Sequence, residues 1–103
     1  MNKVNLEELS KFIENSERGL VMFSTEWCGE CKMNFPLIEK FEAEHSNTKF
    51  VKIDVDEAKL WQEDNNENYK VKSVPTYHLY ENGQLVNEFE GFINPQKLKE
   101  ILG

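Results

Sequence analysis

The sequence has few cysteines, few prolines and no long apolar run. Its 103 residues include only two cysteines and three prolines. Two cysteines are too few for a disulfide-rich scaffold, and no stretch approaches the ~20 consecutive apolar residues that a membrane-spanning helix needs. Residues 1–8 also lack the apolar core of a signal peptide. We therefore expect a cytoplasmic protein with no membrane partner.

Basic residues are also scarce. The chain has 12 lysines and arginines against 19 aspartates and glutamates, which gives a formal net charge of −7. A general nucleic-acid binder needs clustered basic residues for phosphate contacts, so we expect no nucleic-acid partner. The acidic surface can serve solubility or attract basic partners, and the sequence does not separate these two roles.

What is present is typical of one globular domain. Hydrophobic residues make up 39% and charged residues 30% of the chain, and 103 residues are enough to bury a core without disulfides. No repeat, linker or low-complexity tract divides the sequence. We therefore expect a single domain over residues 1–103, and a monomer.

Apolar spacing predicts an alternation of helices and strands. Asn5 is the N-cap candidate of the first helix, which should end near Gly19. The second helix contains Pro36 and carries Met33 on its apolar face. The predicted helices cover residues 6–16, 28–44 and 57–69, with a last helix starting at Pro95, and the predicted strands cover residues 20–23, 49–56, 74–80 and 85–92.

Two local patterns define the expected architecture. Residues 20–23 form a continuous apolar run, which is typical of a central strand buried on both faces. Asn82 and Gly83 separate two β-prone runs and predict a tight hairpin. Strands alternating with helices in the first half, and a hairpin in the second, predict an α/β domain with a mixed sheet.

The two cysteines, Cys28 and Cys31, lie where a predicted strand gives way to a predicted helix. Free backbone N–H groups and the positive end of the helix dipole stabilise a thiolate there, so Cys28 is the candidate nucleophile. Two thiols at this spacing can exchange a disulfide with a partner protein, with Cys31 resolving the mixed disulfide. Gly29 leaves the approach open, and Trp27 can offer the partner an apolar surface.

Half of a zinc site, or two unconnected thiols, are the other interpretations of such a pair. Structural zinc usually takes four cysteine or histidine ligands. Only His45 and His78 remain in the chain, and neither stands at ligand spacing to the cysteines. We therefore expect no metal at Cys28 and Cys31.

Several motifs in order resemble the thioredoxin family, and in particular its small single-domain members. Residues 27–32, with the sequence Trp-Cys-Gly-Glu-Cys-Lys, resemble the family's Trp-Cys-Gly-Pro-Cys-Lys active site. Pro36 matches the proline of the active-site helix, and Val74-Pro75-Thr76 resembles the loop in which the family has a cis proline. Asn82-Gly83 and Gly91 also match, so the resemblance covers about residues 6–102.

The resemblance implies a thioredoxin fold, with a central mixed β-sheet of four to five strands flanked by four helices. It places Pro75 beside Cys28 and Cys31, and the backbone of Ser73 and Val74 toward an extended substrate segment. It also implies a protein-disulfide reductase without a dissociable cofactor. The electron donor would be a flavoprotein reductase that uses NADPH.

The sequence departs from the family at two positions. Glu30 replaces the proline between the cysteines, and its carboxylate should disfavour the Cys28 thiolate and raise the pKa of that thiol. Met22, a core residue by its chemistry, replaces a buried aspartate that takes the proton of the second thiol, and Lys52 matches the lysine beside it. Because methionine cannot transfer protons, we expect the proton to leave through water, Glu30 or Glu26.

Two functions remain open on the sequence alone. One is the reductase, and the other is a redox-weak peptide-binding or adaptor module that uses the groove beside Pro75. The presence of both cysteines favours the reductase. We assign no site role to His78, which we expect in a surface or half-buried position. We also assign none to the remaining aromatic residues, which we expect in packing rather than in ligand contacts: Trp61, Tyr69, Tyr77, Tyr80 and Phe92.

Overall fold

The central strand of the sheet is β2 (Arg18–Ser24), in which six of the seven residues are buried. The computed structural model describes residues 1–102, and across this range the strand order is β1-β3-β2-β4-β5. β1 (Asn2–Lys3) pairs parallel with β3 (Lys49–Asp54), and β3 pairs parallel with β2. On the other side of β2, β4 (Thr76–Glu81) pairs antiparallel with it and forms an antiparallel hairpin with β5 (Gln84–Glu90). The expected mixed sheet is confirmed, with five strands over these residues.

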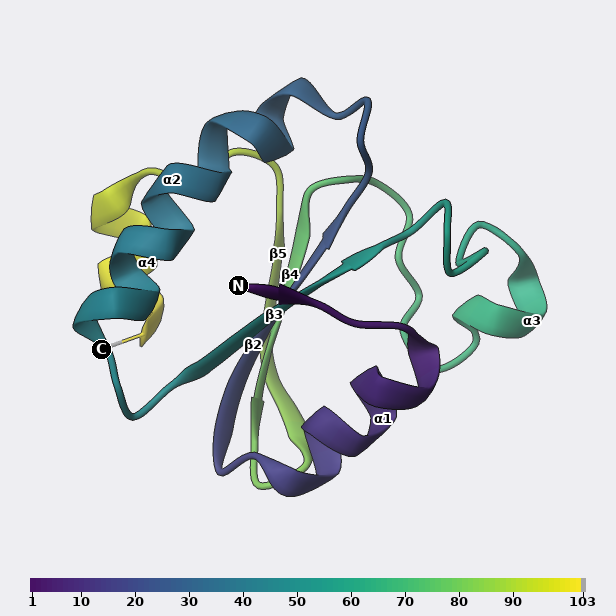
Figure 1. Cartoon of the computed structure of the whole chain (residues 1–103), viewed down its shortest axis with the longest axis horizontal. Helices are drawn as coiled ribbons and strands as arrows, with labels where there is room; N and C mark the ends of the chain where they lie inside the picture. Colours follow the sequence, from purple (N-terminus) through teal and green to yellow (C-terminus); the bar gives the residue numbers. More distant parts are fainter. Residues whose placement is uncertain (103) are drawn as a thin grey trace.

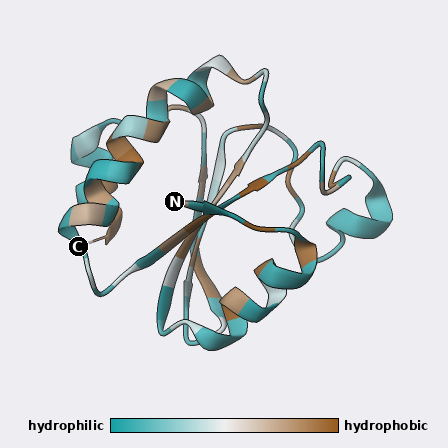
Figure 2. Cartoon of the chain, in the orientation of Figure 1, coloured by the Kyte–Doolittle hydropathy of each residue, from teal (hydrophilic) through white to brown (hydrophobic). Residues whose placement is uncertain are grey.

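Helices cover both faces of this sheet. α2 (Gly29–Glu44) and α4 (Pro95–Leu102) lie on one side, and α1 (Leu6–Asn15) and α3 (Glu63–Asn66) lie on the other (Figure 1). Alternate residues of β2 point into the two layers, and Figure 2 shows hydrophobic residues along the central strands. The α2 side buries Leu20, Met22, Ile38, Tyr77 and Leu98, and the α1 side buries Leu9, Val21, Phe23, Ile53 and Leu60.

Local sequence signals account for the start of α1 and for the hairpin, but not for the end of α1. Asn5 caps α1 in a reciprocal capping box with Glu8, as its position predicts. α1 ends at Asn15, and Gly19 lies in β2, so the predicted glycine stop is wrong. A Cβ at Gly19 would stand 2.7 Å from the Phe12 ring, which gives this glycine a packing role. The hairpin turn is confirmed, with φ of 52° at Asn82 and 84° at Gly83.

The predicted helix over residues 57–69 is wrong over most of its length. Only Glu63–Asn66 is helical, and the preceding segment is a series of turns. Lys59 and Lys70 both have φ of 54°, a left-handed backbone that a helix cannot continue through. The apolar residues of this segment do not recur at helical spacing, and Leu60, which is fully buried, anchors the loop instead.

No helix within residues 1–102 has both the length and the apolar character needed to cross a membrane.

Candidate active site

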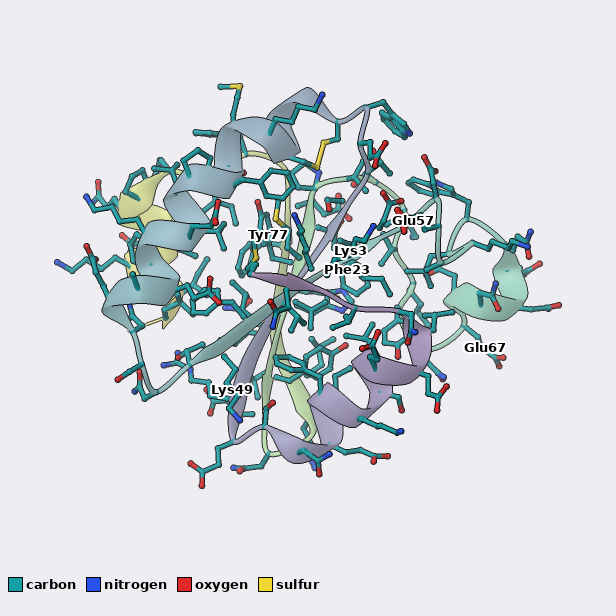
Figure 3. All side chains as sticks on the ribbon, viewed as in Figure 1. Lys3, Phe23, Lys49, Glu57, Glu67 and Tyr77 are labelled. Atoms are coloured by element: carbon teal, nitrogen blue, oxygen red, sulfur yellow. A yellow bond between two sulfur atoms is a disulfide. The ribbon has the colours of Figure 1, made fainter. Side chains whose placement is uncertain are left out.

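A disulfide between Cys28 and Cys31 lies at the N-terminal end of α2, with the two Cα atoms 5.2 Å apart. Figure 3 shows it as the yellow sulfur–sulfur bond beside the first turn of that helix. Cys28 is the N-cap residue, and its Sγ accepts a hydrogen bond from the backbone N–H of Cys31 at 3.1 Å. Cys28 is 5% exposed and Cys31 is fully buried. The sulfur expected to attack is therefore capped by a helix amide and belongs to the more accessible residue.

The residues between the cysteines leave this end of α2 open. A Cβ at Gly29 would meet no atom within 4 Å. Glu30 is exposed on the first turn, and its Oε2 lies 3.9 Å from where a Cβ at Gly91 would stand. Burial raises the pKa of the Tyr77 hydroxyl, and the negative charge of Glu30 raises it further. The Glu30 carboxylate is thus directed toward the segment after β5 and toward the buried tyrosine.

The loop before β4 has the expected cis peptide bond, between Val74 and Pro75. Pro75 is buried, and Val74 packs against the core cluster that contains both cysteines. The Pro75 carbonyl accepts the N–H of Gly91 at 2.9 Å, and Thr76 Oγ1 donates to the Ser73 carbonyl at 2.7 Å. These bonds hold the loop in place. Binding of a substrate segment by the Ser73 and Val74 backbone stays a prediction.

Trp27 is 66% exposed beside the disulfide, as a docking surface requires. Its Nε1–H donates to Asp56 Oδ2 at 2.7 Å, and Trp61 Nε1–H donates to Asp56 Oδ1 at the same distance.

Trp61 and Phe92 are 44% and 46% exposed, so their expected packing roles are wrong. Met33 is also exposed, because the buried face of α2 carries Cys31, Asn34, Ile38 and Phe41 instead.

Asn34 is a buried residue that the sequence interpretation missed. Its Nδ2 donates to the Ile93 carbonyl at 2.9 Å, and its Oδ1 accepts from Tyr77 Oη at 2.9 Å and from the Ile93 N–H at 3.2 Å. One side chain of α2 thereby joins β4 to the segment before α4. The signal was an amide on the face of α2 that also carries Cys31 and Ile38, but its partners are distant in sequence.

Met22 is fully buried below the site, as expected of a core residue. Lys52 is its partner across β2 and β3, and the Lys52 ammonium lies 4.6 Å from the centroid of the Phe35 ring. Within residues 1–102, Lys52 forms no salt bridge. Lys52 and Glu26 line the same open pocket of about 530 Å³, which also includes Phe35. Glu26 as a proton acceptor for Cys31 stays a prediction.

His78 lies on the far side of the sheet from the disulfide, because it follows Tyr77 in β4 and points to the opposite face. It is only 2% exposed, so the expected surface or half-buried position is wrong. Its Nδ1 lies 3.2 Å from Tyr80 Oη and its Nε2 lies 3.6 Å from a Glu88 carboxylate oxygen. Burial lowers the pKa of His78, and Glu88 opposes this shift in part.

Three acidic residues near β1 bring their carboxylates close together. Glu26, Asp54 and Glu57 each bring one carboxylate oxygen to within 4.8 Å of the others. Lys3 Nζ donates to both oxygens of Glu57, at 2.9 and 2.8 Å (Figure 3). Asp54 Oδ1 accepts the backbone N–H groups of Asp56 and Glu57, at 2.9 and 3.0 Å. A lysine and two amides thus occupy two of the three carboxylates, and we assign no metal to this cluster.

The whole chain, residues 1–103, matches a family model described as Thioredoxin. Thioredoxin from Mycoplasmoides gallisepticum is 32% identical over 98 residues, which span 95% of this chain and 94% of that protein. Thioredoxin from Ictalurus punctatus is 36% identical over 100 residues, spanning 93% and 89% of the two chains. Among solved structures, Plasmodium falciparum thioredoxin superposes with a TM-score of 0.87 at 31% identity, over 99% of this chain and 96% of the other.

Proposed function

We propose that this chain, which belongs to the thioredoxin family and has its fold, reduces disulfides in other proteins with Cys28 attacking and Cys31 resolving. Its family relationship establishes it as a thiol–disulfide oxidoreductase that acts on protein disulfides. One observation carries the finer assignment. Cys28 Sγ caps α2 by accepting the Cys31 N–H at 3.1 Å, and Cys28 is the more exposed cysteine of the pair.

In the proposed reaction the Cys28 thiolate attacks one sulfur of the substrate disulfide. A bond forms between Cys28 Sγ and that sulfur, and the other substrate sulfur leaves as a thiolate. Cys31 then loses its proton and attacks Cys28 Sγ, which closes the Cys28–Cys31 disulfide and releases the second substrate thiolate. Two electrons pass to the substrate, whose two thiolates take up protons. The disulfide in the structure corresponds to the product of this half-reaction.

The residues around the disulfide are proposed as the substrate surface. Trp27 offers an exposed indole, Gly29 adds no side chain over the cysteines, and Val74 and Pro75 form the fixed loop opposite them. Because Pro75 is buried, we assign it the role of holding the loop, and because Trp27 is exposed, we assign it direct contact with the substrate. We assign the Cys-Gly-Glu-Cys sequence of residues 28–31 as the active-site motif.

Three further residues are proposed to tune the chemistry. Glu30 places a carboxylate on the first turn of α2, where its negative charge repels the negative charge of the Cys28 thiolate. Met22 occupies the core below the site and cannot accept the Cys31 proton, and Lys52 stands across the sheet from it. The release of the Cys31 proton therefore passes through water or through an exposed acid, Glu30 or Glu26.

The cellular setting is also part of the proposal. We propose a cytoplasmic monomer of one domain that serves in electron transport and redox homeostasis. A flavoprotein reductase using NADPH would restore the dithiol, since thiol exchange alone leaves Cys28 and Cys31 oxidised after each turnover. No dissociable cofactor is required, because both electrons are carried by the two sulfurs.

Reduction of insulin disulfides, with dithiothreitol as the electron source, tests this function. The wild type is expected to accelerate the reaction, and Cys28→Ser is expected to abolish the acceleration while remaining folded by circular dichroism. An inactive wild type, or an active Cys28→Ser variant, would overturn the proposal. An inactive wild type that still binds peptides would support the adaptor module instead.

A further inference from the structure

Two exposed indoles flank one carboxylate next to the disulfide. Asp56 accepts Trp27 Nε1–H on one oxygen and Trp61 Nε1–H on the other, both at 2.7 Å. The two tryptophans are 66% and 44% exposed, so their rings are held in position without being buried. Trp27 directly precedes Cys28, and Trp61 comes from the loop after β3. The loop thus adds a second aromatic ring to the surface beside the nucleophile.

The chemistry around this indole pair is acidic. An open pocket of about 430 Å³ is lined by Trp27 together with four carboxylates. Among residues 1–102, Lys3, which binds Glu57, is the one basic residue in a salt bridge with these acids. In Figure 3, Lys3 and Glu57 lie together near β1 and the loop that follows β3. The carboxylates that line the pocket are those of Glu26, Asp54, Asp56 and Glu57.

Aromatic faces beside carboxylates bind cationic side chains. An ammonium or guanidinium group is attracted by the indole face and by nearby carboxylates at the same time. A neutral apolar side chain would pack on the indole face without being attracted by the carboxylates. An acidic side chain would be repelled by the carboxylates. The formal net charge of −7 adds long-range attraction for a basic segment.

We propose that Trp61 determines substrate specificity, by forming with Trp27 and Asp56 a docking surface for a substrate segment that carries an arginine or lysine near its reducible disulfide. This inference rests on the proposed function, because it names the substrates of the same dithiol. Trp61 contacts the basic side chain, and Asp56 holds both indoles in place. Cys28 then meets the substrate disulfide at the neighbouring position of the chain.

Two peptide disulfides that differ in one residue beside the cystine, arginine or glutamine, test this specificity. With dithiothreitol as the electron source, wild type is expected to have a kcat/KM about fivefold higher for the arginine peptide, the size of an exposed cation–π contact. Trp61→Ala is expected to remove most of this preference, because its kcat/KM should fall more for the arginine peptide than for the glutamine peptide. Trp61→Phe, which keeps an aromatic face, should keep part of the preference.

Leu85→Ala is the matched control, because Leu85 in β5 is 45% exposed, close to the 44% of Trp61. It should keep the full preference for arginine. Equal rates of wild type with both peptides, or an unchanged preference in Trp61→Ala, would overturn the inference and leave the reductase function standing. If Trp61→Ala lowers kcat/KM equally for both peptides, Trp61 has only a structural role, and the inference is overturned as well. A wild type that reduces neither peptide would overturn the reductase function and the inference with it.

Discussion

At the scale of single residues, two groups act in opposite directions on the ionisation of Cys28. The Cys31 N–H lies 3.1 Å from Cys28 Sγ at the start of α2, and both this hydrogen bond and the helix dipole favour a thiolate. Glu30 lies on the same first turn. Its negative charge interacts favourably with the helix dipole but disfavours a second negative charge on Cys28. The reactivity of Cys28 should therefore respond to the residue at position 30.

Glu30→Pro is expected to lower the pKa of the Cys28 thiol in the reduced protein, because it removes the carboxylate and stiffens the turn. The pH profile of the alkylation rate with iodoacetamide measures this pKa. Glu30→Gln is the control that removes the charge without adding a proline, and it should give part of the shift. Identical profiles for the wild type and both variants would refute an effect of Glu30 on the thiol.

Residues of the site differ in how far the sequence could predict them. The cysteines, the cis Val74–Pro75 bond and the exposed Trp27 follow from short motifs, and each has the expected geometry. The roles of Asp56 and Asn34 could not be predicted, because Trp27 and Tyr77, which donate to them, lie 29 and 43 residues away along the chain. The exposure of Trp61 could not be predicted either. A large aromatic side chain is usually buried, but the path of the loop after β3 leaves Trp61 exposed.

At the scale of elements, Asn34 joins three parts of the fold. It binds the backbone of Ile93 through both N–H and carbonyl groups and accepts from Tyr77 in β4. These residues are buried, so losing the Asn34 side chain leaves several polar atoms without hydrogen-bond partners. Losing the Tyr77 hydroxyl has a smaller effect, because Asn34 Oδ1 keeps its hydrogen bond from the Ile93 N–H. The two ends of this bond should therefore differ in energetic importance.

Asn34→Ala is expected to lower the free energy of unfolding by about 2–5 kcal/mol, because two buried donors, the Tyr77 hydroxyl and the Ile93 N–H, and one acceptor, the Ile93 carbonyl, lose their partner. Tyr77→Phe, which removes one hydroxyl and keeps the ring, should cost only about 1 kcal/mol. Urea unfolding followed by circular dichroism compares the two variants. Equal losses, or a smaller loss for Asn34→Ala, would contradict the role of Asn34 as the shared partner.

Elements with local signals matched the sequence, and one without them did not. The apolar run at residues 20–23, the Asn82-Gly83 turn and the Asn5 cap each determine structure within a few residues. The segment over residues 57–69 is polar and aperiodic, and its path depends on the burial of Leu60 and on left-handed backbone at Lys59 and Lys70. Tertiary packing outweighs helix propensity in this segment.

At the scale of the whole molecule, the sheet separates a redox face from a face that carries a buried histidine. The disulfide lies on the α2 side, and His78 lies on the α1 side against Phe23, with ring centroids 4.7 Å apart. Because burial holds the pKa of His78 below the ordinary 6.5, the folded protein takes up this proton only at lower pH than the unfolded chain does. The contribution of His78 to stability is therefore full above pH 6.5 and is lost as the pH falls below it.

His78→Phe is expected to flatten the pH dependence of unfolding just below pH 6.5, where one proton taken up on unfolding gives a slope of at most about 1.4 kcal/mol per pH unit. Urea midpoints measured at several pH values give this slope. His45→Gln, which replaces the other histidine of the chain, is measured beside it for comparison. A slope that is the same in His78→Phe and in the wild type would assign the pH dependence to other groups.

The central claim is that Cys28 attacks and Cys31 resolves, and trapping the mixed disulfide tests it most directly. Cys31→Ser, reduced and then mixed with a peptide disulfide, is expected to accumulate a covalent adduct that mass spectrometry of the digested protein locates at Cys28. Cys28→Ser, treated in the same way, should form little adduct, because Cys31 is fully buried. Failure of Cys31→Ser to trap the peptide, or faster trapping at Cys31 in Cys28→Ser, would contradict the account.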